Sequence, residues 1–243
     1  MKKPGHNHSS EKGSSGNSDN SGDNCDSAYR SKHWRERFSC WLALAMLAIA
    51  FPVWAGNQKY EPLAASVQAA LHAAVADQAS PEPKFSSLQE KIEWLAEMSR
   101  RLEKRMPNRQ GRLEFLKTVY YEAQRAGLDP QMVMGLIQVE SGFKKYAVSS
   151  AGARGYMQGM PFWVKLIGTG EQNLFHLRTN LRFGCTILRH YLDIEKGDLY
   201  RALGRYNGSL GSPEYPNMVR GAWDKQWSWS RPAAPNPATT SSS

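Results

Sequence analysis

A chain of 243 residues, 41% of them hydrophobic and 11% aromatic, is long enough for one domain with its own core plus additional segments. Its formal net charge of +9 favours an anionic partner such as a nucleic acid, a membrane surface or an anionic cell-wall polymer. The sequence has no RNP-like aromatic signature, no zinc-finger spacing and no basic region followed by heptads. Nucleic acid is therefore not the partner that we expect.

Residues 1–55 have the pattern of a leader. Residues 1–29 are mostly Ser, Gly, Asn, Asp and His, and they carry too few large apolar side chains to fold. A basic stretch then precedes an apolar run at 40–55 that ends in "VWAG", which is typical of a secretory signal peptide cleaved after Ala55. A retained membrane anchor is the alternative, but the run is short for a spanning helix and contains Pro52. We expect a periplasmic protein, membrane-anchored only if the signal is retained.

Cleavage would change the cysteine content and the charge of the chain. Cys25 and Cys40 lie in the leader, so the mature chain would keep only Cys185 and could form no internal disulfide. The 24 Lys and Arg and the 17 Asp and Glu that remain give a net charge of +7. An exported protein without a disulfide must be held together by its own core, and Cys185 is expected to be a thiol within it.

Residues 56–108 are expected to form an Ala- and Pro-rich linker followed by a helical extension. The segment 56–85 contains three prolines and mostly small apolar residues, so it would be partly helical. The segment 86–106 has an amphipathic pattern that ends at Pro107. Its apolar stripe consists of Leu88, Ile92, Leu95, Leu102 and Met106. This region is also where we expect protein partners of the cell envelope to bind.

Residues 109–228 have the pattern of a mainly α domain, and 229–243 that of a disordered tail. A helix over 111–126 places Leu113, Leu116, Tyr120 and Ala123 on one face and ends at Gly127. Asp129 as N-cap and Pro130 begin the next helix, which breaks at Gly142. Further helices are predicted from Pro161, over 179–196, over 199–207 behind the cap Asp198, and over 216–227. No alternating strand pattern persists beyond a few residues.

Glu140 differs from the other carboxylates in its surroundings. In the helix 130–141 it shares a face with Val133, Leu136 and Ile137. Burial disfavours the ionised carboxylate, and the negative end of the helix dipole acts in the same direction, so both raise the pKa of Glu140. An acid that keeps its proton near neutral pH can protonate a glycosidic oxygen. On the helix pattern alone, a surface Glu in a final turn explains this position equally well.

No second carboxylate stands in a comparable setting, although a glycosidase usually needs two. The candidates are Glu171, Asp193, Glu195, Asp198 and Glu214. Asp198 is better explained as a helix cap, and its neighbours as a polar helix face. One acid suffices where the substrate supplies the nucleophile. The sequence also lacks an HExxH motif, a Cys pair, a His cluster and a nucleophile elbow, so we expect no metal and no other cofactor.

The segment "GLDPQMVMGLIQVESGFKKYAVSSAGARGYMQGMP" resembles the opening of the soluble lytic transglycosylase catalytic domain, which is related in fold to goose-type lysozyme. The matching blocks are Glu140-Ser141-Gly142-Phe143, Ala147-Val148-Ser149, Gly152-Ala153 with Gly155, Met157-Gln158, Asn180 with Gly184, and Tyr206-Asn207. The likeness covers about 110–228. It implies a mainly α, lysozyme-like domain with room for a small β-hairpin, preceded by the helical extension.

The resemblance also implies an activity on peptidoglycan glycan strands. The β-1,4 bond between N-acetylmuramic acid and N-acetylglucosamine would be cleaved while the muramic 6-hydroxyl attacks, leaving a 1,6-anhydro end. Glu140 would act first as acid and then as base. A hydrolytic lysozyme on the same fold, and a non-catalytic cell-wall-binding or secretion-assembly protein, are the alternatives.

Five further residues receive substrate-binding roles by their position in the matching blocks. Ser149, Gln158 and Met160 would line the groove. Tyr206 would hydrogen-bond near Glu140 and help to orient it, and Asn207 belongs to the same element as Tyr206. Each has an ordinary explanation as well, in loop polarity for Ser149 and Gln158 and in packing for Met160 and Tyr206.

The sequence departs from the pattern of this family at two places. Phe162 and Trp163 follow the Met-Pro pair, where many relatives have a small residue and Thr. Gly204 and Arg205 stand in place of an Ala-Ala-like pair before the Tyr-Asn element. We expect these departures to affect the preference for particular substrates more than the reaction.

Overall fold

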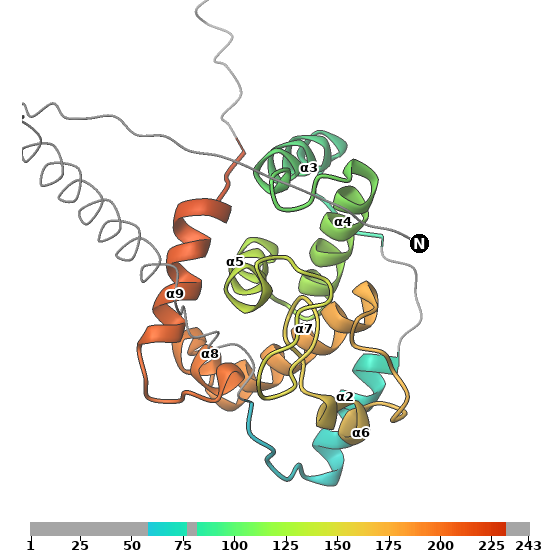
Figure 1. Ribbon diagram of the computed structural model, residues 1–243, viewed down its shortest axis with the longest axis vertical. Helices are drawn as coiled ribbons and strands as arrows, with labels where there is room; N and C mark the ends of the chain where they lie inside the picture. The colour runs from blue at the N-terminus through green and yellow to red at the C-terminus, as the bar shows by residue number, and fades with distance from the viewer. Residues whose placement is uncertain (1–57, 77–81, 232–243) are drawn as a thin grey trace, which may run out of the picture. The chain divides into compact units, whose positions relative to one another are not determined.

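A computed structural model of the protein describes residues 58–76 and 82–231, so the leader predicted at 1–55 lies outside the described residues. The described part is mainly helical, as predicted (Figure 1). Its elements are α2 (Ala65–Ala76), α3 (Leu88–Leu102), α4 (Arg109–Arg125), α5 (Pro130–Ser141), α6 (Pro161–Ile167), α7 (Leu177–Ile194), α8 (Leu199–Asn207), α9 (Glu214–Ala222) and the π-helical turn η1 (Trp223–Trp227). In place of a hairpin, the described residues contain two isolated β-bridges, Val148–Arg154 and Arg154–Gly159.

The ends of the helices follow from local capping. Asp129 accepts hydrogen bonds from the backbone N–H groups of Gln131 and Met132, at 2.6 and 3.2 Å, and so begins α5. Gly142 ends α5 in the left-handed conformation, with φ 56°. Asp198 caps α8 by accepting from the N–H of Arg201 at 3.1 Å. These boundaries confirm the predicted starts of α5 and α8.

Helix α5 is enclosed by neighbouring helices (Figure 1). It packs against α4, α9 and η1, and the six residues Met132–Ile137 are all buried. Gly135 is needed for this packing, because a Cβ atom there would lie 2.9 Å from the backbone nitrogen of Trp223. The backbone of η1 therefore lies directly on α5, the helix that carries Glu140.

Helix α3 buries only part of the predicted apolar stripe. Leu88 is 73% exposed and Ile92 54% exposed, whereas Trp94, Met98 and Leu102 are fully buried. The indole of Trp94 packs edge-to-face on Tyr120 of α4, with ring centroids 4.9 Å apart. The prediction was right for Leu102, while Leu95 and Met106 pack on the core in part. It was wrong for Leu88 and Ile92, because the indole of Trp94 buries a large apolar area and turns its side of the helix toward α4.

Helices α4 and α7 are joined by a buried ion pair. The carboxylate of Glu122 is fully buried, and Arg182 donates to it from Nη2 at 2.8 Å and from Nε at 3.1 and 3.2 Å. Arg125 donates to the same carboxylate at 3.0 Å. Because these charges are removed from water, the loss of one partner would leave a buried charge uncompensated and would destabilise the fold.

Residues 58–76, predicted as part of a linker, pack on the same core. Leu71 and Val75 of α2 are buried within it, and α2 lies against α6 and α7. The side-chain amide of Gln68 donates to the carbonyl of Leu166 in α6 at 2.6 Å. The helical extension at α3 joins the core as well, through Trp94 and Met98.

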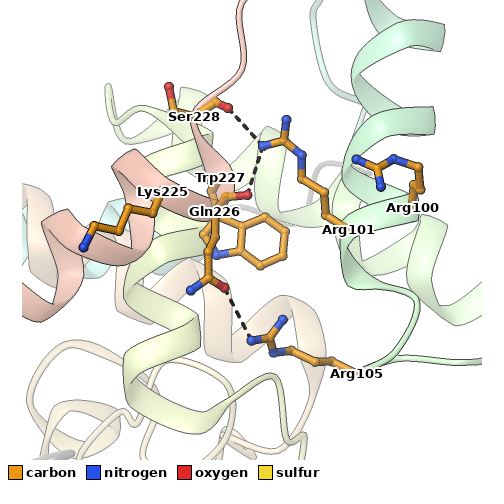
Figure 2. Close-up of a pocket in the computed structure, with 7 residues that line it drawn as sticks. All are labelled: Arg100, Arg101, Arg105, Lys225, Gln226, Trp227 and Ser228. Carbon is orange, nitrogen blue, oxygen red and sulfur yellow. Dashed lines mark hydrogen bonds between the residues drawn. The ribbon is translucent and has the colours of Figure 1, made fainter.

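Arg100 and Arg101 of α3 and Arg105 in the turn after it line a pocket together with η1, the last helical turn in the described part of the chain (Figure 2). Arg101 donates to the carbonyls of Gln226 and Ser228, both at 2.9 Å, and Arg105 donates to the Gln226 side chain at 3.5 Å. Trp227, in the same turn, donates from Nε1 to Gln138 of α5 at 2.9 Å. None of the predicted site residues lines this pocket, in which Arg101 and Arg105 bind the C-terminal segment.

Candidate active site

Glu140 lies in the last turn of α5 and is 3% exposed. Its Oε1 accepts a hydrogen bond from the hydroxyl of Tyr215 in α9, and its Oε2 has no hydrogen-bond partner among the described residues. Burial raises the pKa of Glu140 to about 8, against the lowering effect of the Tyr215 hydrogen bond. Burial therefore favours the protonated form of the carboxyl group near neutral pH.

Two buried tyrosines lie beside this acid. Burial raises the pKa of both Tyr206 and Tyr215 well above the ordinary value, and the charge of Glu140 adds to the effect at each. The Tyr206 hydroxyl donates to the carbonyl of Met157 at 2.8 Å. Tyr215, and not Tyr206, is thus the tyrosine that bonds the carboxyl group.

The role of Tyr215 was missed from the sequence. The available signal was its position four residues before Val219, on the inner face of the last helix. That spacing marks a buried side chain and gives no information about a partner 75 positions earlier in the chain. Tyr206, by contrast, was identified through its Tyr-Asn element.

The loop between α5 and α6 carries Ser149 and Gln158. The Ser149 hydroxyl accepts from the N–H of Ala153 at 3.1 Å, so it bonds within the loop. Gln158 is fully buried at φ 49°, and its amide donates to the carbonyls of Ala147 and Gly155 at 3.1 and 2.8 Å. These bonds close the loop on itself and leave Oε1 of Gln158 without a partner in the described part of the chain.

Asn180 of α7 anchors this loop to the helical core. Its Oδ1 accepts from the N–H of Met157, and its Nδ2 donates to the carbonyls of Arg154 and Leu174, all at 2.8 Å. Gly155 has φ 76°, and a Cβ atom on it would lie 2.5 Å from Asn180 Nδ2. The residue pair Gly155 and Asn180 therefore fixes the loop beside the site.

The remaining predicted residues are Met160 and Asn207. Met160 is half-buried, immediately precedes α6 and packs on the core. Asn207, at the end of α8, donates to the Ser209 hydroxyl at 3.0 Å, and its Oδ1 is buried without a partner among the residues described.

Three of the predicted site residues thus share one property. Glu140, Gln158 and Asn207 each hold a buried side-chain oxygen that no described group donates to. Buried polar atoms in proteins are nearly always hydrogen-bonded. The amide oxygens of Gln158 and Asn207 can accept hydrogen bonds from the hydroxyl and acetamido N–H groups of a sugar, whereas the protonated carboxyl group of Glu140 can donate one from Oε2.

The domain is thus mainly helical and carries a buried acid of raised pKa in the last turn of its enclosed helix α5, features that suit acid-catalysed cleavage of a glycosidic bond. Residues 117–218 match the family model of the transglycosylase SLT domain. This match confirms, over residues 117–218, the resemblance to that family stated above.

Relatives of known name are similar to this domain. A transglycosylase of Enterobacteria phage PRD1 is 35% identical over 105 residues, which cover 43% of this chain and 38% of the phage protein. The membrane-bound lytic murein transglycosylase C of Actinobacillus pleuropneumoniae serotype 5b (strain L20) is 44% identical over 48 residues, or 20% of this chain and 13% of that protein. The corresponding protein of Haemophilus influenzae (strain PittEE) is 42% identical over the same length. The matched segments thus span well under half of each relative's length.

Across residues 58–76 and 82–231, no helix combines the length and the apolarity needed to cross a bilayer.

Proposed function

We propose that the protein is a lytic transglycosylase that cleaves the β-1,4 bond between N-acetylmuramic acid and N-acetylglucosamine in peptidoglycan. Glu140 donates its proton to the bridging oxygen as the bond from the muramic C1 breaks. The muramic 6-hydroxyl oxygen then bonds to C1, and its proton passes to the Glu140 carboxylate. The products are a free 4-hydroxyl and a 1,6-anhydro end, so no water is consumed and the acid is regenerated.

The observation that carries this proposal is the neutral, enclosed Glu140 with its unpartnered Oε2. A general acid must hold a proton at the working pH and have an oxygen free for the leaving group. Tyr215 occupies the other oxygen and fixes the orientation of the carboxyl group.

The surroundings of the other carboxylates also favour a single-acid reaction. Asp193 bonds Arg189, Glu195 bonds Arg201 and Arg205, and Asp198 caps α8. The arginines lower the pKa of Glu195, as befits an ion-paired carboxylate. Each of these groups has a structural task in the described residues, and the substrate's own hydroxyl can serve as the nucleophile.

The test is mass spectrometry of sacculi digested with the purified protein. We expect anhydro-muropeptides from the parent and none from Glu140→Gln, which keeps the shape of the side chain and should keep the fold by circular dichroism. Glu171→Gln, an exposed control, should match the parent. Muropeptides with reducing ends and no anhydro form would identify a hydrolytic lysozyme instead, and full activity of Glu140→Gln would refute the role of Glu140.

We also infer that the protein acts in the cell envelope. The signal-peptide pattern of 1–55 and the names of the murein-degrading relatives support this location. Fractionation of cells that express the full chain, with immunodetection in the periplasm, membrane and cytoplasm, would check it. Recovery in the cytoplasm alone would contradict the inference.

A further inference from the structure

The first described residues, 58–61, form what we call the N-terminal strap, which lies across α6 and α8. Gln58 is 4% exposed, and its Oε1 accepts from the indole Nε1–H of Trp163 at 2.8 Å. The ring of Tyr60 meets that of Phe162 edge-on, with centroids 5.8 Å apart. Glu61 pairs with Arg205 of α8 at 3.4 Å. Three of the four strap residues therefore contact the domain through side chains.

The two helices that the strap joins adjoin predicted site residues. Helix α6 begins directly after Met160, and α8 ends with Tyr206 and Asn207. The Gln58 side chain also opposes the rise in the pKa of Tyr206, and its Nε2 has no hydrogen-bond partner among the described residues. The strap therefore links two segments that are distant in the sequence, since Met160 and Tyr206 lie 46 positions apart.

The strap uses the residues at which the sequence departs from the family pattern. Phe162, Trp163 and Arg205 are its three partners. Trp163 is buried, and Arg205 is held on its other side by Glu195. Three of the four departures, all except Gly204, thus contact the strap.

We propose that the N-terminal strap determines glycan affinity by holding α6 at a fixed position relative to α8. This inference rests on the proposed function, because the glycan is the ligand that Met160 and the Tyr206–Asn207 pair would bind. A preorganised site loses less free energy in ordering its walls when a ligand binds. Removing the strap contacts should therefore weaken the binding of glycan oligomers.

The strap can be altered without removing the core. Tyr60 and the Glu61 side chain are 61% and 51% exposed, and an exposed ion pair contributes little to stability. The test protein is the full chain with Tyr60→Ser and Glu61→Gln combined, and a second variant is Gln58→Leu. The matched control is His72→Ala, an exposed position on α2 away from these contacts.

The first measurement is calorimetric binding of an N-acetylglucosamine hexamer to proteins that also carry Glu140→Gln, so that no turnover is needed. We expect each strap variant to raise Kd by about fivefold or more, and the control to stay within about twofold. The second is the KM and kcat of each variant with active Glu140 on soluble glycan strands, where KM should rise by a similar factor and kcat should change by less than about twofold.

A purely structural role would lower the melting temperature and leave the Kd and KM of the folded protein unchanged, and that result overturns the proposal. So does the absence of measurable hexamer binding by the Glu140→Gln protein. Strap-dependent binding in a protein whose parent releases no anhydro ends would refute the proposed reaction and leave the strap's role standing. If the parent is active but the strap variants leave Kd and KM unchanged, the proposed role of the strap is refuted and the proposed reaction stands.

Discussion

At the residue scale, the acidity of Glu140 is set by two opposed effects. Burial raises its pKa to about 8, and the hydrogen bond from Tyr215 holds that value down. Tyr215→Phe removes only the donor, so the pKa of Glu140 should rise further. Because the reaction begins from the protonated acid, the basic limb of kcat/KM should move to higher pH, while kcat falls about tenfold through lost orientation. A pH–rate profile from pH 5 to 10 measures both.

Tyr206→Phe is the matched control for that variant. Its hydroxyl bonds the carbonyl of Met157 and not the carboxyl group, so it should change the rate through the loop without a comparable shift of the basic limb. A Tyr215→Phe profile displaced toward lower pH would contradict the assigned role of Tyr215.

The same acid makes the stability of the fold depend on pH. Glu140 keeps its proton up to about pH 8 in the folded chain but loses it near pH 4.5 once unfolded. The folded state therefore binds more protons between these values, and stability falls as pH rises through this window. The cost reaches up to about 5 kcal/mol above pH 8. Urea unfolding measures the difference in the free energy of unfolding between Glu140→Gln and the parent. This difference should shift in favour of Glu140→Gln from pH 5 to pH 8, and the same difference at both pH values would contradict the prediction.

Sequence reasoning found the acid but not its donor. The helix face of residues 130–141 made Glu140 a candidate, and the resemblance of the surrounding blocks to a known family gave it the role of the acid. Tyr215 reaches it from another helix, and no periodicity within either helix records that meeting. The roles of Ser149, Gln158, Met160, Tyr206 and Asn207 toward substrate remain predictions.

At the scale of elements, the loop between α5 and α6 depends on glycine for two separate reasons. Gly152 and Gly155 both have positive φ, but a Cβ atom would find open space at Gly152 and would lie 2.5 Å from Leu174 O at Gly155. Gly152→Ala should cost only the backbone strain, about 1 kcal/mol. Gly155→Ala should cost roughly 3 kcal/mol and most of the activity, because Asn180 must move. Thermal unfolding and sacculus digestion compare the two, and equal effects would contradict this account.

Helix ends were predictable, whereas the buried face of α3 was predicted only in part. Asp129, Gly142 and Asp198 act on backbone groups within a few residues, so the sequence contains the whole interaction. The buried face of α3 depends on where Tyr120 of α4 lies, and the stripe built on Leu88 and Ile92 failed for that reason.

At the scale of the whole molecule, the pairing of α4 with α7 depends on one buried carboxylate. Arg182→Met would leave Glu122 without its closest partner and should destabilise the fold by on the order of 3 kcal/mol. Arg189→Met removes an exposed pair with Asp193 on the same helix and should cost less than about 1 kcal/mol. Urea denaturation measures the loss of unfolding free energy in each variant. Equal losses in Arg182→Met and Arg189→Met would contradict the prediction.

The class of fold was predictable because helical periodicity and caps recur through 86–227. The part played by residues 58–76 was not, because small apolar residues such as those of α2 signal neither a linker nor a core element. Their burial appears only when α6 and α7 are present to receive Leu71 and Val75. The domain boundaries at 56–108 and 109–228 stay predictions.

The enclosure of α5 has a consequence for its motion. Backbone amides exchange with solvent deuterium only when their hydrogen bonds open, and a helix covered by α4, α9 and η1 has no exposed side from which to open. Deuterium uptake at Met132–Ile137 should therefore be as slow as unfolding of the entire domain. Glu140, the proposed proton donor, would then lie on a segment that opens only when the domain unfolds, and any adjustment to the proposed glycan ligand would have to come from the surrounding loop.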